Sequence, residues 1–309
     1  ARSQEASLFL PGTLQRSLVD GFFSTPFGSP NETRVLSNRL EWQHNVQITK
    51  LLLLSAGYQF REQQGENDQG LTNRVLSSHA GFAQAQFNLW DRVFATAGVR
   101  HDSYNVFGDA TTYRLTGGYY QKETDTKLRV GYATGFRAPS MNELYFPNFG
   151  NPNLGPEKNQ SMDAGIDQYF FSKQLKITGG LFWNHYRNLI ITTFDPGFCA
   201  SFSTFGFCPQ QLGEASTKGW EAGLSYTYSS DRPFLKGVVV QAQYTNTITR
   251  DLETNTRLPR WPTDQWSASV SYQPIDPLWI TLIGRYVGSR FNATGDRQAL
   301  PAFDVWSLA

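Results

Sequence analysis

The chain has 309 residues, which is enough for one large domain or two ordinary ones. Its 27 Lys and Arg residues nearly balance 26 Asp and Glu, and the net charge of +1 argues against a protein that binds nucleic acid by neutralising phosphates. Aromatic residues make up 15% of the chain, yet the mean hydropathy is −0.42 and the longest plain apolar run is Leu51–Leu54. A membrane helix needs ~20 apolar residues, so a helical membrane protein is excluded; a membrane β-barrel is not, because its strands are apolar only at alternate positions.

Apolar and polar residues alternate with a period of two from about residue 33 to the end, which is typical of β-strands with two different faces. Thr217–Tyr228 is the clearest run, with Trp220 and Leu224 on one face and Glu221 on the other. Most predicted strands have the ~9–11 residues that cross a bilayer with tilt, whereas a soluble sandwich strand usually has ~5–6. The pattern predicts about thirteen strands, at residues 33–45, 48–60, 74–88, 92–102, 110–120, 126–134, 161–171, 174–190, 216–229, 237–249, 263–273, 278–289 and 302–309.

The predicted connections alternate between short turns and long loops along the whole chain. This is the pattern of an up-and-down barrel that has short periplasmic turns and long outer loops, and a Greek-key sandwich has no reason to show it. The sequence therefore predicts an all-β, antiparallel transmembrane barrel. Short turns lie at residues 46–47, 89–91, 121–125, 171–173, 230–236 and 274–277, and long loops at 61–73, 103–109, 135–160, 191–215, 250–262 and 290–301.

Aromatic residues recur near the ends of the predicted strands. This placement is similar to the aromatic girdles at the two interfaces of a membrane, and the alternative is the ordinary enrichment of aromatics in strands. Strand length and loop alternation favour girdles. The residues are Trp42, Tyr58, Phe60, Trp90, Tyr119, Tyr228, Trp266, Tyr272, Trp279 and Tyr286.

The segment Tyr132–Glu157 leaves a predicted strand, passes a proline corner and returns through a Gly-Asn-Pro-rich stretch. Proline cannot donate to a sheet ladder, so a rigid loop between two strands accounts for Pro139, Pro152 and Pro156. The whole segment also resembles the TonB-dependent receptor family. The resemblance is carried by Tyr132, Phe136, Arg137, Ala138, Pro139, Glu143, Leu144, Tyr145, Gly150, Asn151, Pro152, Asn153, Leu154, Pro156 and Glu157.

Other positions add to this resemblance or depart from it. Arg100-His101-Asp102 is similar to the Arg-x-Asp that the family usually has at this place. Gly155 stands where the family often has Lys, and Asp163-Ala164-Gly165 stands where a Glu-x-Gly is common. These departures are small.

The resemblance implies a protein of the bacterial outer membrane whose barrel has 22 strands and holds an amino-terminal plug. It implies uptake of a scarce ligand, with a ferric siderophore first and cobalamin or haem next, energised by the proton gradient through the TonB complex, which pulls on the plug. It further implies contact with outer-membrane lipid and lipopolysaccharide, and no covalent chemistry. A passive porin-like channel is the first alternative, and an outer-membrane enzyme is the second.

Thirteen strands is an odd number, and bacterial single-chain barrels have an even one. The sequence shows no plug, no TonB box and no terminal aromatic strand. We therefore expect residues 33–309 to form one incomplete barrel domain from the middle and later part of a larger protein. Residues 1–32 are expected to be the tail of an extracellular loop.

Cys199 and Cys208 lie close together in a Gly/Phe/Ser-rich segment and predict a disulfide that closes a small loop, with two unpaired thiols as the alternative. Phe194, Phe198, Phe202, Phe205 and Phe207 surround them, as ligand contacts or as a core for this loop. The candidate ligand-binding residues are Arg137, Tyr145, Phe146, Phe149 and Phe194, for which packing within the loops is the alternative.

No residue cluster predicts catalysis, a metal or a cofactor. His44, His79, His101 and His185 are scattered without metal-ligand spacing. Glu143 and Glu157 are the one conceivable pair of acids, and both belong to the loop motif.

Overall fold

The computed structural model describes residues 15–24, 30–67, 74–211, 213–232, 234–292 and 299–309, and it describes side chains from residue 35 onward except that of residue 67. Its main feature is one antiparallel sheet of 14 strands, in the order β1-β2-β3-β4-β5-β6-β7-β8-β9-β12-β13-β14-β15-β18. Neighbours in the sheet are neighbours in the chain, apart from two small inserted hairpins. The topology is therefore up-and-down, as predicted.

The strand bounds are as follows. The main sheet contains β1 (Gln15–Ser24), β2 (Pro30–Thr49), β3 (Leu52–Asn67), β4 (Arg74–Leu89), β5 (Val93–Tyr104), β6 (Gly108–Gln121), β7 (Thr126–Arg137), β8 (Glu157–Phe170), β9 (Leu175–Arg187), β12 (Glu214–Arg232), β13 (Leu235–Asp251), β14 (Asp264–Ile275), β15 (Leu278–Val287) and β18 (Phe303–Leu308). The hairpins are β10 (Ile190–Phe194) with β11 (Phe207–Gln211), and β16 (Arg290–Phe291) with β17 (Ala299–Leu300). The helices are α1 (Met141–Tyr145) and α2 (Pro196–Cys199).

All thirteen predicted strands are present, and β1 is an additional one. It pairs with β2 from Gln15↔Arg39 to Ser24↔Pro30, so the prediction that residues 1–32 are only a loop tail is corrected at Gln15–Ser24. The alternation pattern missed this strand because its sequence contains the doublets Leu18-Val19 and Phe22-Phe23, which break a period of two. Residues 1–14 lie outside the described part of the chain.

The two faces of the sheet differ in polarity, as the alternation predicts. On the apolar face, Tyr132, Met162 and Trp183 stand in register on β7, β8 and β9. On the polar face, Lys176, Ser225 and Gln241 stand in register on β9, β12 and β13. Leu181 is 66% exposed on the apolar face, an exposure that suits contact with lipid.

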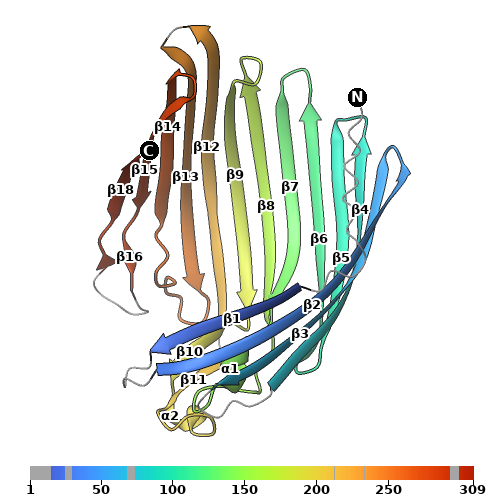
Figure 1. The fold of residues 1–309 in the computed structure, drawn as a ribbon, viewed down its shortest axis with the longest axis vertical. Coiled ribbons are helices and arrows are strands. Elements are labelled where there is room, and N and C mark those ends of the chain that lie inside the picture. Colours follow the sequence, from blue (N-terminus) through green and yellow to red (C-terminus); the bar gives the residue numbers. More distant parts are fainter. Residues whose placement is uncertain (1–14, 25–29, 68–73, 212, 233, 293–298) are drawn as a thin grey trace.

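Figure 1 shows the long connections gathered at one end of the sheet, where α1, α2, β10 and β11 lie, and tight turns at the other end. We call these the long-loop end and the short-turn end. The helices have 5 and 4 residues, and no helix in the described ranges is long and apolar enough to cross a membrane. The fully buried apolar side chains gather at the long-loop end instead of between layers; they include Pro139, Leu144, Cys199, Cys208 and Pro209.

Candidate functional site

Arg137, the last residue of β7, joins three segments at the long-loop end. Its Nε and Nη2 atoms donate hydrogen bonds of 2.7 Å each to the carboxylate of Glu157, the first residue of β8. Its Nη1 and Nη2 atoms donate to Glu143 of α1, at 3.0 Å each. Bidentate pairs of this kind fix geometry as well as charge. The guanidinium therefore sets the position of α1 relative to the two strands.

The start of α1 is a capping box. The Ser140 backbone N–H donates to Oε2 of Glu143 at 2.7 Å, and the Glu143 N–H donates to Oγ of Ser140 at 3.3 Å. Burial would raise the pKa of Glu143, but the hydrogen bonds from Arg137 and Ser140 outweigh it, and the pKa lies below its ordinary value. Glu143 is thus a carboxylate at neutral pH, as its ion pair with Arg137 requires.

Gly150 and Asn151 fold the return segment back onto α1. The Gly150 N–H donates to the Phe146 carbonyl and the Asn151 N–H to the Glu143 carbonyl, both at 2.7 Å. A Cβ atom on Gly150 would lie 2.6 Å from the backbone nitrogens of Phe146 and Tyr145, so only glycine fits here. The Asn151 carboxamide oxygen accepts from the Asn153 N–H at 3.0 Å, which forms a local turn.

The predicted disulfide is present between Cys199 and Cys208, with a Sγ–Sγ distance of 2.10 Å. It joins α2 to β11 inside the hairpin made by β10 and β11. Asp195 caps α2, accepting from the N–H groups of Gly197 and Phe198 at 3.1 and 3.0 Å. Both sulfur-bearing residues are fully buried.

This hairpin is fastened to the return segment. The Gly155 N–H donates to the Gln211 side-chain oxygen at 2.9 Å, and the Gln211 side-chain nitrogen donates to the Gly155 carbonyl at 2.8 Å. The buried Asn151 side chain donates to the Pro209 carbonyl at 3.1 Å. The Ile190 N–H donates to Glu157 at 2.8 Å, on the carboxylate that also holds Arg137. Residues 137–157 and 190–211 therefore form one body, which we call the loop body.

The motif residues of the loop body differ in burial. Pro139, Leu144, Asn151 and Leu154 are buried, whereas Pro152 and Asn153 are exposed. Phe136 lies close to Tyr104 of β5, with 5.8 Å between ring centroids. The buried set packs inside the loop body. The remaining motif positions Ala138 and Pro156 are intermediate in exposure.

The candidate ligand residues fall into two groups. Tyr145, Phe146 and Phe149 are half-buried, with Phe146 and Phe149 in edge contact at 6.3 Å and the Arg74 guanidinium 5.2 Å from the Tyr145 ring. Phe194 is 63% exposed and contacts Phe207 at 4.8 Å between centroids.

The aromatic residues beside the disulfide point mostly outward. Phe198, Phe205 and Phe207 are exposed, and Phe202 is intermediate. The buried core next to the disulfide consists instead of Ser203, Pro209 and Gln210, whose amide lies 3.7 Å from the Cys199 sulfur. Together with Phe194, the exposed residues Phe198, Phe205 and Phe207 make an aromatic surface, which we call the phenylalanine patch.

A cavity of about 560 Å³ lies where the loop body meets β2–β5. Sequence reasoning did not single out most of its lining. Arg61 and Tyr104 lie on the polar face. The sequence signal that could have identified them is the alternation along β3 and β5, which places every second residue on that face. The lining comprises Val35, Arg61, Gln63, Leu76, Ser78, Tyr104, Phe136, Arg137, Ala138, Pro139, Ser140, Met141 and Asn142.

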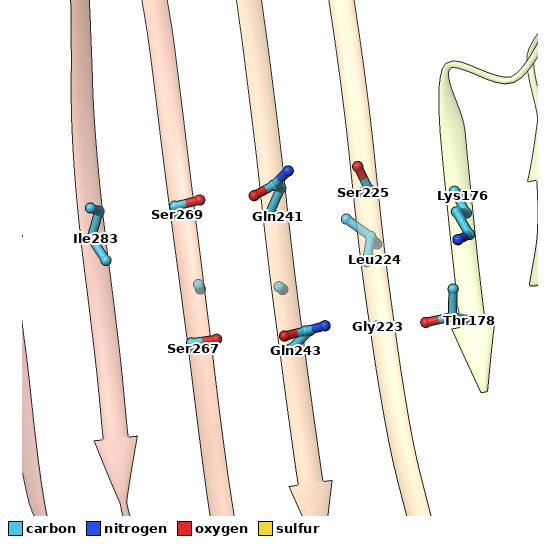
Figure 2. A pocket seen from close by; sticks show the side chains of 12 residues that line it. Lys176, Thr178, Gly223, Leu224, Ser225, Gln241, Gln243, Ser267, Ser269 and Ile283 are labelled. Carbon is cyan, nitrogen blue, oxygen red and sulfur yellow. The ribbon is translucent and has the colours of Figure 1, made fainter. Parts of the chain in front are cut away.

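The polar face carries hydrogen-bonding groups over its whole height. Figure 2 shows Lys176, Ser225 and Gln241 side by side on β9, β12 and β13, in a cavity of about 420 Å³. Asp167 is nearly buried between Arg129 and Lys176, with nitrogen–oxygen distances of 3.6 Å to each. Arg100 likewise holds the buried Asp102 through two bonds of 2.8 Å. Such a face suits a hydrated or protein-filled lumen.

Two carboxylates of the loop body lie around one guanidinium group. Glu143 and Glu157, the one pair considered from the sequence, are both bonded to Arg137 and serve as its counter-ions. Within the described ranges, no three His, Cys, Asp or Glu side chains gather closely enough to hold a metal ion.

Comparison with known proteins gives a family and a fold. A family model described as TonB dependent receptor-like, beta-barrel matches residues 4–309. A vitamin B12 transporter of Vibrio vulnificus is 27% identical over 291 residues, which is 91% of this chain and 44% of the relative. A vitamin B12 transporter of Photobacterium profundum is 27% identical over 139 residues, 45% of this chain and 23% of the relative. The chain thus spans less than half of the length of these curated relatives.

Solved structures show the same architecture. A mutant ferric enterobactin receptor from Pseudomonas aeruginosa superimposes with a TM-score of 0.70 at 17% identity, over 96% of this chain and 50% of the other. The copper transporter OprC superimposes with a TM-score of 0.68 at 15% identity, over 90% of this chain and 48% of the other. These likenesses establish the fold.

Proposed function

Because the chain belongs to the TonB-dependent receptor β-barrel family, we propose that it is part of a receptor that takes up a scarce cobalamin or ferric siderophore with energy supplied through TonB. Members of the family are outer-membrane β-barrel proteins, and they are transporters and receptors, not enzymes. The apolar face of the sheet lies against lipid. The long-loop end faces the cell exterior, as the pattern of loop lengths in such barrels supports.

The loop body carries this proposal. It places the phenylalanine patch and the cavity of about 560 Å³ together at the long-loop end, where a receptor meets its ligand. Exposed rings give large contact areas with little loss of conformational freedom, which suits the capture of a large, rigid ligand. Arg61 lines the cavity, and the Arg74 guanidinium lies over the Tyr145 ring, so both supply cationic groups nearby.

We rank cobalamin ahead of a ferric siderophore, the ligand that sequence analysis placed first. The similarity to the relative named vitamin B12 transporter runs over 91% of this chain and supports this order. The siderophore receptors among the solved structures are below 25% identity and bear on the fold alone. Haem ranks third.

The partners follow from the same proposal. The TonB complex would act on a plug held against the polar face, whose charged residues Arg129, Asp167 and Lys176 offer fixed partners. Outer-membrane lipid and lipopolysaccharide would surround the apolar face.

Growth and uptake in a deletion strain test the function. The strain carrying the full-length receptor should grow on limiting cobalamin, and the deletion strain should not; the same comparison with ferric siderophores tests the second ligand class. Uptake should stop when the proton gradient is collapsed or TonB is removed. Uptake that continues would identify a passive porin-like channel and refute the proposal.

A further inference from the structure

The wall of the barrel is split between β6 and β7 at the long-loop end. Pairing of these two strands stops at Arg114↔Ala133, although β6 begins at Gly108 and β7 continues to Arg137. The ladders on either side do not stop there: β5 and β6 pair to the start of β6, and β7 and β8 pair to the end of β7. Beyond the last pair, β6 therefore stays with β5, and β7 stays with β8.

Open space lies along the split. A cavity of about 230 Å³ is lined there by residues 109–113 of β6 and 134–136 of β7. A Cβ atom on Gly135 would meet nothing within 4 Å. The Tyr113 N–H donates to the Thr134 hydroxyl at 2.8 Å, so a side chain takes the place of a ladder carbonyl. The end of β7 has room to move here, and few backbone hydrogen bonds oppose the movement.

Each side of the split is fastened within itself. Asn105, in the turn before β6, donates from its N–H to the Ser77 carbonyl at 3.2 Å, and its side chain accepts from the Ser77 N–H at 3.0 Å and donates to the Val75 carbonyl at 3.1 Å. These bonds join the ends of β4, β5 and β6, which we call the β6 unit. On the other side, Arg137 and Glu157 hold the loop body to the ends of β7 and β8. We call the loop body with these two strand ends the β7 unit.

The cavity of about 560 Å³ lies between the two units. Arg61, Ser78 and Tyr104 line it from β3, β4 and β5, and residues 136–142 line it from the β7 unit. Phe136 lines this cavity and also the smaller one in the split, so the two cavities are neighbours. A change in the width of the split therefore changes the width of the larger cavity.

The contacts between the two units include ones that tolerate displacement. The Phe136 ring meets the Tyr104 ring edge to face, with 5.8 Å between centroids. The Arg74 guanidinium lies 5.2 Å from the centroid of the Tyr145 ring in α1. Such contacts are attractive over a range of separations, ~4.5–7 Å between ring centroids and up to ~6 Å for a cation over a ring. They can hold the units together in more than one relative position.

We propose that the split allows a hinge motion of the barrel wall, in which the β7 unit turns as one body toward β3–β5 when cargo enters the larger cavity. Cargo that touches both sides of this cavity makes more contacts when the split is narrow. That difference in affinity shifts the equilibrium toward the closed form. The moving part is a piece of the wall and not the loops alone. The inference rests on the proposed function, because cargo is what closes the cavity.

Distances between pairs of spin labels, measured by pulsed electron paramagnetic resonance, test the hinge in the full-length receptor in nanodiscs. Cys199 and Cys208 are bonded to each other and take no label. The pair across the split is Val75→Cys with Lys158→Cys, exposed positions on β4 and β8 that are at least about 19 Å apart at ~4.8 Å per strand. The reference pair is Lys158→Cys with Arg250→Cys, on β8 and β13, which continuous ladders connect at this end.

The hinge predicts two differences between these pairs. Without cargo, the pair across the split should give a wider distribution of distances than the reference pair. With saturating cobalamin, or with a ferric siderophore as the second ligand class, the distance across the split should shorten by more than about 2 Å, and the reference distance should stay constant. If Lys158→Cys fails to assemble, Gln160→Cys on the same face of β8 takes its place.

A label in the loop body separates the hinge from movement of the loops alone. The distance between Val75→Cys and Asn153→Cys should shorten together with the distance across the split. Shortening of this loop distance alone would place the movement in loops above a fixed wall and would overturn the proposal. Equal widths of the two cargo-free distributions, or unchanged distances with cargo bound, would also overturn it. The comparison of widths needs no cargo, so it tests the hinge even if the transport proposal fails.

Discussion

Arg137 and Glu157 face each other across the β7–β8 pair, and two hydrogen bonds of 2.7 Å join their side chains. The same guanidinium holds Glu143 of α1, and the same carboxylate holds the Ile190 N–H of the disulfide hairpin. One ion pair therefore connects the barrel wall to both halves of the loop body. Removal of this ion pair should therefore loosen segments that are far apart in the sequence.

The first prediction concerns this ion pair. Arg137→Gln should loosen residues 138–157 and 190–211 together, because Glu157 loses its counter-ion while remaining largely buried. Arg137 is partly exposed, so solvent screening limits the cost to about 1–3 kcal/mol of local stability. Hydrogen exchange followed by mass spectrometry measures this as lost protection in both segments. Arg92→Gln removes the ion pair with Glu123 at the short-turn end and should leave both segments protected; loss of protection in only one segment would show that they are independent.

The second prediction concerns Gly150. Gly150→Ala places a Cβ atom 2.6 Å from the backbone nitrogens of Tyr145 and Phe146 at the end of α1, and the helix must shift to admit it. We expect increased hydrogen exchange in α1 and a fall in cargo affinity. Gly135→Ala is the matched control, since a Cβ atom there meets nothing within 4 Å. Equal effects of the two substitutions would contradict the steric argument.

Much of this architecture could be predicted from the sequence, and there are physical reasons why the rest could not. Alternation identified the long strands because each has one lipid-facing and one polar face, but it missed β1, whose apolar residues come in pairs. The motif of residues 132–157 indicated a rigid loop. It could not show that Gln211 and Asn151 tie this loop to the disulfide hairpin, because such contacts join positions more than 50 residues apart.

The third prediction concerns the disulfide. Cys199→Ser/Cys208→Ser should loosen the hairpin of β10 and β11 and leave the barrel strands intact. The bond closes a short loop, for which a stabilisation of about 2–3 kcal/mol is typical and would be local. Proteolysis should then cut within residues 191–211, while the barrel keeps its resistance to heat and detergent. Unfolding of the whole barrel on reduction would contradict the assignment of the disulfide to the loop body alone.

The fourth prediction concerns pH. The pKa of Glu143 is lowered in the folded protein, since the hydrogen bonds from Arg137 and Ser140 outweigh burial. A lowered pKa contributes stability that is fully present above the unfolded value, here 4.5, and is lost as the pH falls through the folded value. Protection of α1 should therefore be constant from neutral pH down to about 4.5 and decline below it. Glu143→Gln should remove this acid-induced decline, and a decline that begins near pH 6 would point to another group.

The fifth prediction concerns the phenylalanine patch. Phe194→Ala should weaken cargo binding by about 2- to 12-fold, the range expected for one aromatic contact of ~0.5–1.5 kcal/mol. Phe194 is 63% exposed and its ring partner Phe207 is also exposed, so its removal should not disturb the loop body. Phe234→Ala removes an exposed ring of the same type at the short-turn end and should leave binding unchanged. Titration of the full-length receptor with cobalamin and, separately, with a ferric siderophore measures both variants. If Phe194→Ala binds both ligands normally and Tyr145→Ala binds them more weakly, the binding surface is the half-buried wall around α1 and not the hairpin.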